Sequence, residues 1–275
     1  MSDFVTTVHG DRVAYDRYQP SIGSSEGSPV VVFVAGAGPY REIDPITAPT
    51  AEALAREGIT SVVYDRIGRG ESTASGTGPL TLEREIAALG ALIEASGGGS
   101  AVLSGHSSGC SIALAAASAG LSVAGLVLWE APLGGITGGT KAWFDEIARR
   151  VASGDLEGAL VHYMKDMPPE WLEGARHSPM FPGMVARVGS QLPDAESLAW
   201  ADSAPLADLV GSLTIPVLAL YGEQTQPLMV EAAETIASSI PRAAARRLPG
   251  ANHAWEPSAM ASELVAFVTT RASGS

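Results

Sequence analysis

The sequence has few cysteines and few charged residues, and each shortage excludes a class of protein. Among 275 residues the only cysteine is Cys110, so no disulfide can form within the chain. No cluster of cysteines and histidines has metal-ligand spacing, so we expect no metal site. Charged residues make up 17% of the chain and hydrophobic residues 46%, a balance that argues against wholesale disorder and favours a chain with a large apolar core.

Basic residues are also scarce, at 17 against 30 acidic ones, which gives a net charge of −13. Such a chain repels nucleic-acid phosphates and anionic lipid headgroups, so we expect neither nucleic acid nor a membrane as partner. The N-terminus, Met-Ser-Asp-Phe, lacks the basic and apolar regions of a secretory signal, which favours a cytoplasmic location. The uncharged run 110–129 could cross a bilayer by length, but Gly120 and Gly125 divide it into a predicted buried helix and a buried strand.

Short apolar runs alternate with helix-like segments along most of the chain. Runs at 30–35, 61–64, 101–103, 125–129 and 216–221 are typical of strands buried on both faces, and 243–248 is a further candidate. Between two of them, residues 80–95 carry apolar side chains at helical spacing. This alternation predicts βαβ units and a parallel sheet with helices on both faces.

The alternation stops between about residues 133 and 213, where the sequence is helix-like, interrupted by prolines and free of buried-strand runs. We therefore expect a core of residues 1–132 and 214–275 with a helical cap at 133–213. The cap holds three of the five tryptophans and four of the seven methionines, which we expect mainly to form its own core. Four of them are also candidates for an apolar substrate pocket: Trp143, Met164, Trp171 and Met184.

The pentapeptide Gly105-His106-Ser107-Ser108-Gly109 fits the Gly-x-Ser-x-Gly pattern of a nucleophile elbow. A predicted strand precedes it and an Ala-rich helix follows, which is the setting that this motif requires. Glycines on both sides of the serine let the backbone close into a sharp, strained turn. An ordinary Gly-rich turn is the less favoured interpretation, and Ser107 is the candidate nucleophile.

A serine hydroxyl needs a base within hydrogen-bond reach and an acid behind that base. His253 lies in the loop between the last predicted strand and the last helix, where the base is expected if the chain order is serine, acid, histidine. The acid has two candidates. Glu130 directly follows the strand 125–129, where a lone carboxylate is costly unless it is partnered, and we favour it over Glu223, which follows the strand 216–221.

Stabilising the oxyanion of an acyl-transfer reaction takes two backbone N–H groups. One is expected from Ser108, the residue after the nucleophile. The other is expected from the loop Ala35-Gly36-Ala37-Gly38-Pro39, where Ala37 is the first choice and Gly38 the second. This loop lacks the Gly-x-Gly-x-x-Gly and Lys-Ser/Thr patterns of phosphate-binding loops.

In these features the chain resembles the α/β-hydrolase superfamily, and the resemblance extends over nearly its whole length. The segment Tyr64-Asp65-Arg66-Ile67-Gly68-Arg69-Gly70-Glu71-Ser72 resembles the Tyr-Asp-Arg-x-Gly-Arg-Gly-Asp/Glu-Ser sequence of one bacterial subgroup, and we expect its charges to form a structural Asp–Arg network at the edge of the sheet. The placement of the acid at position 130, directly after a strand, is similar to that in certain haloalkane dehalogenases and in zearalenone-type lactonases. Many relatives instead carry an aspartate near position 225, where this chain has threonine.

The resemblance implies an eight-stranded, mostly parallel sheet, a helical cap and an acyl-enzyme mechanism without a cofactor. The serine at position 107 argues against the aspartate-dependent dehalogenases and epoxide hydrolases of this fold. We expect a serine hydrolase that cleaves a carboxylic ester or lactone of a small to medium apolar substrate. Alternatives with the same residues are an acyltransferase, a perhydrolase or a carbon–carbon bond hydrolase, and a non-catalytic ligand-binding protein is less favoured. The sequence does not indicate an oligomeric state.

Overall fold

The computed structural model describes residues 2–21, 29–97 and 99–272. In this part of the chain nine strands form one sheet, in the order β1-β2-β4-β3-β5-β6-β7-β8-β9. The strands are β1 (Asp3–Thr6), β2 (Arg12–Tyr18), β3 (Val30–Val34), β4 (Ser61–Tyr64), β5 (Ala101–His106), β6 (Val123–Trp129), β7 (Val217–Gln224), β8 (Ala243–Ala251) and β9 (Ala254–Trp255).

The six strands from β4 to β8 in this order pair in parallel, as the alternation of apolar runs predicts. Strands β1 and β2 precede them as an antiparallel hairpin that pairs with β4. The eight strands expected from the family resemblance become nine because β9, only two residues long, pairs antiparallel with the end of β8. A strand of two residues is too short to leave a periodic pattern in the sequence.

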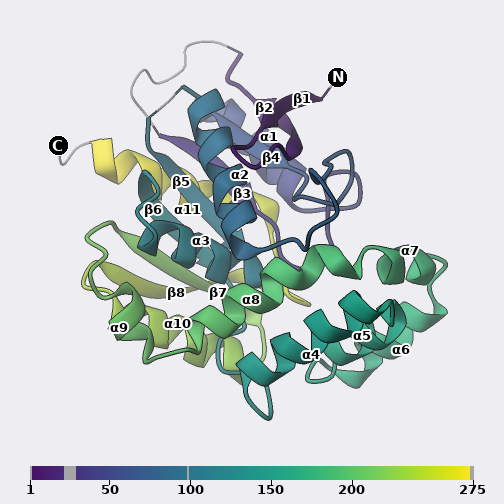
Figure 1. Cartoon of the computed structure of the whole chain (residues 1–275). Helices are drawn as coiled ribbons and strands as arrows, with labels where there is room; N and C mark the ends of the chain where they lie inside the picture. The colour runs from purple at the N-terminus through teal and green to yellow at the C-terminus, as the bar shows by residue number, and fades with distance from the viewer. Residues whose placement is uncertain (1, 22–28, 98, 273–275) are drawn as a thin grey trace.

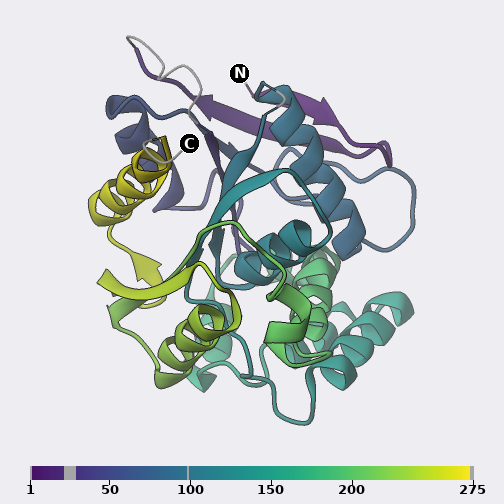
Figure 2. The ribbon, with the colours of Figure 1, turned by 90° about the vertical axis from the view of Figure 1, so that its left-hand side faces the viewer.

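Helices cover both faces of the sheet (Figures 1 and 2). On one face lie α2 (Leu82–Ala95), α3 (Ser108–Ser118), α9 (Leu206–Val210) and α10 (Pro227–Ser239), which share one apolar core with the strands. On the other face α1 (Thr47–Arg56) and α11 (Pro257–Ala272) enclose a second core. Strands covered on both sides must be apolar along their whole length, which explains why β3 reads Val-Val-Val-Phe-Val.

Between β6 and β7 the chain forms a series of helices, coloured teal to green in the lower part of Figure 1. They are α4 (Thr140–Ser153), α5 (Leu156–Tyr163), α6 (Pro169–His177), α7 (Phe181–Ala186), the 3-10 helix η1 (Val188–Gln191), α8 (Leu192–Ala201) and α9. Buried side chains of α4, α5, η1 and α8 form a third apolar cluster around Trp143 and Leu160. The last helix of the predicted cap, α9, packs instead into the core beside the sheet.

Local signals explain where several helices begin and end. The Thr81 side chain accepts a hydrogen bond from the backbone N–H of Arg84 and caps the start of α2. Asp155 caps α5 in the same way through Gly158, and Gly154 ends α4 in the left-handed conformation. None of the described helices is long and apolar enough to span a membrane.

Candidate active site

The predicted site residues meet at the carboxyl ends of the parallel strands. Ser107 lies between the end of β5 and the start of α3, and Glu130 directly follows β6. His253 lies in the two-residue connection between β8 and β9, and Ala37 lies in the loop after β3. The carboxyl ends of parallel strands lie at one edge of the sheet, and ligands of α/β folds bind there.

Ser107 occupies a sharp turn with φ of 55° and ψ of −129°. Its N–H donates to the carbonyl of Trp129 on the neighbouring strand over 2.9 Å. The two motif glycines are required by close packing. A Cβ on Gly105 would lie 2.7 Å from the Cα of Cys110, and one on Gly109 would lie 2.1 Å from the carbonyl oxygen of Val34. The Gly-x-Ser-x-Gly pattern therefore reflects a turn pressed against β3 and α3.

Glu130 and His253 are joined directly. His253 Nδ1 lies 2.6 Å from Glu130 Oε2, and the backbone N–H of Gly222 donates to Glu130 Oε1 over 3.0 Å. The Glu130 side chain is only 2% exposed. Burial alone would raise the pKa of Glu130, but hydrogen bonds from His253, Thr225 and Gly222 outweigh it and lower the pKa. The carboxylate is thus held ionised behind the imidazole, in a position to fix its tautomer and stabilise its protonated form.

The candidate residues share an unusual backbone conformation. In the described part of the chain four non-glycine residues have a positive φ: Ser107 at 55°, Glu130 at 48°, Asn252 at 53° and His253 at 65°. A positive φ is costly for residues with a side chain and persists only where the surroundings impose it. Three of the four are the residues that the sequence analysis selected as nucleophile, acid and base, so the strain is concentrated at this site.

The alternative acid, Glu223, lies apart from this arrangement. It is exposed near the end of β7, and none of the hydrogen bonds between described residues joins it to His253. Thr225, two residues further along the chain, contributes a side-chain hydrogen bond to Glu130. The position where many relatives carry an aspartate therefore supports the carboxylate at position 130.

Ser107 and His253 line one pocket together with Ala37 and Ser108. Ser108 is the first residue of α3, so its N–H has no partner within the helix. Gly36 must lack a side chain because a Cβ there would lie 2.8 Å from the Cβ of Ser107. No hydrogen bond joins the Ser107 hydroxyl to His253 among the described residues, and such catalytic contacts commonly tighten only when substrate binds.

The pocket is small and mostly apolar, with a volume of about 90 Å³. Two of the four predicted pocket residues line it: Trp143, which is 2% exposed, and Trp171, which is 39% exposed and lies with its ring centre 6.1 Å from that of His253. The other two, Met164 and Met184, pack against the third apolar cluster instead. Lining residues that the sequence analysis missed include Ile136, Leu198 and Met229.

A model of the alpha/beta hydrolase family matches residues 31–267. The chain belongs to this family. No curated protein matches the sequence. Among solved structures, an alpha/beta hydrolase from Sphaerobacter thermophilus is 31% identical with a TM-score of 0.78, and the match covers 96% of this chain and 99% of the other.

More distant structures share the fold of this alpha/beta hydrolase. An esterase from Thermogutta terrifontis is 20% identical with a TM-score of 0.64, and the match covers 99% of this chain and 98% of the other. An enol-lactonase from Burkholderia xenovorans is 17% identical with a TM-score of 0.67, and the match covers 97% of this chain and all of the other. The structures similar to this hydrolase therefore include proteins named for different reactions.

His106 lies beside the histidine of the candidate site. Its Nε2 donates to the carbonyl of His253 over 2.8 Å, and the Trp129 indole donates to the same oxygen over 3.3 Å. Burial, together with repulsion from the charge of His253, lowers the pKa of His106 to about 4. His106 is therefore neutral near pH 7, and its hydrogen bond supports the strained backbone of His253.

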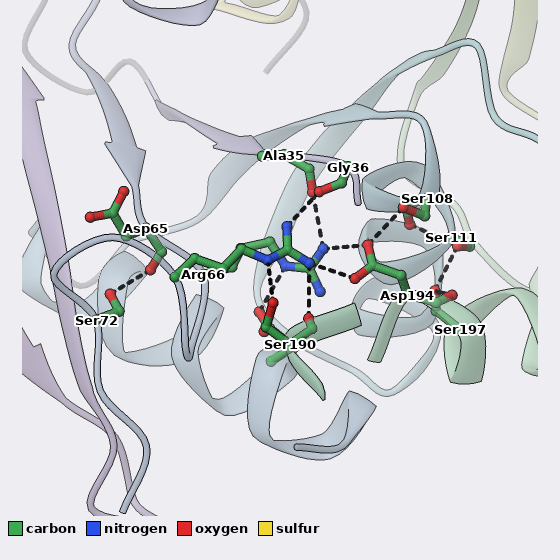
Figure 3. A network of polar contacts seen from close by, with 12 residues as sticks. Ala35, Gly36, Asp65, Arg66, Ser72, Ser108, Ser111, Ser190, Asp194 and Ser197 are labelled. Atoms are coloured by element: carbon green, nitrogen blue, oxygen red, sulfur yellow. Dashed lines mark hydrogen bonds and ion pairs between the residues drawn. The ribbon is translucent and has the colours of Figure 1, made fainter. Parts of the chain in front are cut away.

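The charges of the segment 64–72 form two separate networks in this hydrolase. Asp65 pairs with Arg41, and Glu71 also binds Arg41. The two arginines of the segment, Arg66 and Arg69, both pair with Asp194 at the start of α8. The expected Asp–Arg network therefore includes an aspartate that is distant in sequence. Their network lies under the loop after β3 rather than at an exposed edge of the sheet (Figure 3).

The described residues contain no group of three or more histidine, cysteine, aspartate or glutamate side chains placed to hold a metal ion. Cys110 is buried on α3, and burial raises the pKa of its thiol well above the ordinary value. Its sulfur contacts the carbonyl of Trp129, which agrees with the packing role expected for a buried cysteine.

Proposed function

We propose that the chain is a serine hydrolase that cleaves a carboxylic ester or lactone with a small apolar acyl group. The observation that carries this proposal is the combination of Ser107 on a strained elbow with a hydrogen-bonded His253–Glu130 pair in the same pocket. These parts correspond in kind to the nucleophile, base and acid of acyl transfer.

In this reaction the Ser107 hydroxyl oxygen attacks the carbonyl carbon while His253 Nε2 takes the hydroxyl proton. The bond between carbon and oxygen of the ester then breaks, and His253 gives the proton to the departing alcohol. Water, deprotonated by His253, attacks the acyl-enzyme and releases the carboxylic acid and free Ser107. Glu130 supports both steps because it accepts from Nδ1 and stabilises the imidazolium.

The negative oxygen of the tetrahedral intermediate would be bound by the backbone N–H groups of Ala37 and Ser108. Both residues line the pocket beside the nucleophile. Backbone donors suit this task because they are already oriented before charge develops on the substrate oxygen. Gly38, the second choice from the sequence, follows Ala37 in the same loop but does not line the pocket.

The size and lining of the pocket support a small substrate. Its volume of about 90 Å³ is well below the roughly 300–1,000 Å³ of pockets that hold drug-sized ligands. Ile136, Leu198 and Met229 line the space beside Ser107, so an apolar acyl group fits the chemistry of the walls. Because the enol-lactonase of Burkholderia xenovorans has the same fold, lactones are included among the substrates to be tested.

A series of p-nitrophenyl esters from acetate to decanoate, together with simple lactones, tests the proposal. We expect kcat/KM to be highest for acyl chains of about two to four carbons and Ser107→Ala to lower kcat at least ~10³-fold. Ester turnover that survives in Ser107→Ala would contradict the proposal. Tight ligand binding without turnover by the wild type would favour a binding protein instead.

The same reactions run with added alcohols, hydrogen peroxide or amines distinguish hydrolysis from acyl transfer and perhydrolysis. For a hydrolase, the carboxylic acid remains the main product when these nucleophiles compete with water. Predominant formation of a new ester or peracid would assign the chain to the acyltransferases or perhydrolases. The absence of a cofactor and a cytoplasmic location remain predictions from the sequence.

A further inference from the structure

Four charged side chains form a completely buried cluster, and Figure 3 shows two of them, Arg66 and Asp194, side by side. The buried cluster consists of Arg66 and Arg69 from the segment after β4, Glu85 from α2 and Asp194 from α8, and all four side chains have 0% exposure. Arg66 Nη1 lies 2.5 Å from Asp194 Oδ1, and Arg69 Nη2 lies 2.6 Å from Asp194 Oδ2. Burial alone would raise the pKa of Asp194, but the two arginines hold it below its ordinary value.

The two arginines of the cluster also donate hydrogen bonds to the loop after β3. Arg66 Nη1 donates to the carbonyl of Ala35 over 3.2 Å, and Arg69 Nη1 donates to the carbonyl of Gly36 over 2.6 Å. The Gly36 carbonyl and the Ala37 N–H belong to one planar peptide group and point in opposite directions. Holding the carbonyl oxygen of that group therefore fixes the direction of the N–H of Ala37, a residue that lines the pocket.

The carboxylate of Asp194 reaches the second proposed oxyanion donor. Ser108 Oγ donates to Asp194 Oδ1 over 2.7 Å, the same oxygen that binds Arg66. In Figure 3 Asp194 lies between Arg66 on one side and Ser108 on the other. One carboxylate thus connects the first turn of α3 to the two arginines that hold the loop after β3.

We propose that Arg69 and Asp194 are positioning residues for the oxyanion hole, and that Asp194 makes the helical segment between β6 and β7 part of that alignment. This inference rests on the proposed hydrolase function. The cluster sets the two N–H groups from opposite sides, Ala37 through the Gly36 carbonyl and Ser108 through its hydroxyl. Neither Arg69 nor Asp194 lines the pocket, so both act through the residues they hold.

Fork geometry explains why arginine is suited to position 69. Its guanidinium binds Gly36 O, Asp194 Oδ2 and both the carbonyl and the hydroxyl of Ser190 at the same time. A lysine could keep the charge opposite Asp194, but a single ammonium cannot span these acceptors with the same planar geometry. Arg69→Lys therefore loosens the loop while it preserves the ion pair.

Three variants test the inference through kcat and KM for p-nitrophenyl acetate. Ser108→Ala removes the link between Asp194 and α3 but keeps the Ser108 N–H, and Arg69→Lys loosens the loop. Ser197→Ala is the matched control, because Ser197 is also buried on α8 and its hydroxyl bonds only Ser111 on α3 and the backbone carbonyl of Asp194 among the described residues. Its loss leaves the Asp194 carboxylate bound to both arginines and to Ser108. We expect kcat to fall about 10- to 100-fold in the first two with KM within about threefold, and both constants to stay within about threefold in the control.

A second readout separates alignment of the oxyanion hole from general loosening. The affinity for a trifluoromethyl ketone, whose adduct carries the oxyanion, should weaken in proportion to kcat. The affinity for the matching alcohol, which has no carbonyl, should stay within about twofold of the wild type. A weaker ketone affinity that the alcohol shares equally would overturn the inference, because a merely structural change affects both ligands.

A kcat of Ser108→Ala that stays within about threefold of the wild-type value would also overturn the inference. This variant decides the question if Arg69→Lys does not fold. A wild-type protein that shows no turnover of any ester or lactone tested would overturn the proposed function, and the positioning role with it. Turnover by the wild type with unaffected variants would overturn the positioning role alone.

Discussion

His253 Nδ1 lies 2.6 Å from Glu130 Oε2, and both residues have a backbone φ in the left-handed region. The two are 123 positions apart in the chain and come from the ends of different strands. Strain at both ends of one hydrogen bond, in a pocket that also contains the strained Ser107, indicates that the fold maintains this pair at a cost.

The first prediction concerns the acid. Glu130→Gln removes the charge behind His253 and should lower kcat about 10²- to 10⁴-fold, because the imidazole loses both its fixed tautomer and the stabilisation of its protonated form. Glu223→Gln is the matched control, since Glu223 is exposed and should leave kcat within about twofold. Steady-state kinetics with a short ester checks both variants. A large loss of kcat in Glu223→Gln together with near-normal kcat in Glu130→Gln would make Glu223 the acid instead.

The second prediction concerns stability and pH. The pKa of His106 is lowered to about 4 in the folded chain, mainly by burial, whereas the ordinary value is 6.5. Because the unfolded chain binds the proton first, stability should be complete above pH 6.5 and fall as the pH drops toward 4. The loss through this residue is roughly 2–4 kcal/mol.

Urea unfolding at several pH values checks this prediction in the wild type and in His106→Gln, whose side chain can donate but not titrate. The stability difference between the two proteins should narrow as the pH falls from 7 to 4, since the variant lacks this proton-linked loss. A difference that stays constant across that range would show that His106 titrates alike in the folded and unfolded chains.

The third prediction concerns the buried cluster. Asp194→Ala leaves Arg66 and Arg69 buried without their shared carboxylate and should lower the free energy of unfolding by about 3–5 kcal/mol. Asp145→Ala breaks an exposed pair with Lys141 on α4 and should cost at most about 0.5 kcal/mol. Chemical denaturation measures both, and equal losses in the two variants would contradict the structural weight assigned to Asp194.

The fourth prediction concerns the pocket wall. Leu198→Ala and Met229→Ala enlarge the space beside Ser107 and should move the preferred acyl chain to longer esters by about two carbons. Leu264→Ala on α11 is the control: it empties a similar volume in the other core and should reduce stability without changing the preference. Relative kcat/KM across the ester series is the measurement. An unchanged preference in both pocket variants would place the acyl group elsewhere.

The strands of the sheet and the residues proposed for the site carry local signals in the sequence. The parallel strands are continuous apolar runs. Ser107 lies in a motif whose two glycines are required, because a Cβ on either would lie only 2.1 to 2.9 Å from neighbouring backbone atoms. A lone carboxylate at the end of a buried strand needs a partner, which favours Glu130 as the acid, and His253 Nδ1 lies 2.6 Å from its Oε2. In both cases the sequence shows a residue that would be unfavourable without a particular surrounding: glycines that suit only a crowded turn, and a carboxylate that needs a partner.

The features that were missed depend on contacts between distant segments. Arg66 and Asp194 are 128 positions apart, and nothing near Asp194 in the sequence indicates two buried arginines opposite it. Met164 and Met184 looked equivalent to Met167 by composition, yet only Met167 lines the pocket. The direction in which each short helix turns its side chains is set by how the helices pack together, which composition does not encode.

Reaction of the purified protein with a fluorophosphonate probe, followed by intact mass measurement and peptide mapping, tests the central claim most directly. The account predicts one adduct per chain, located on Ser107, because only a serine activated by a nearby base reacts readily with this probe. The adduct should be lost in Ser107→Ala and strongly slowed in His253→Ala. A folded wild-type protein that acquires no adduct, or acquires one on another residue, would contradict the proposed nucleophile.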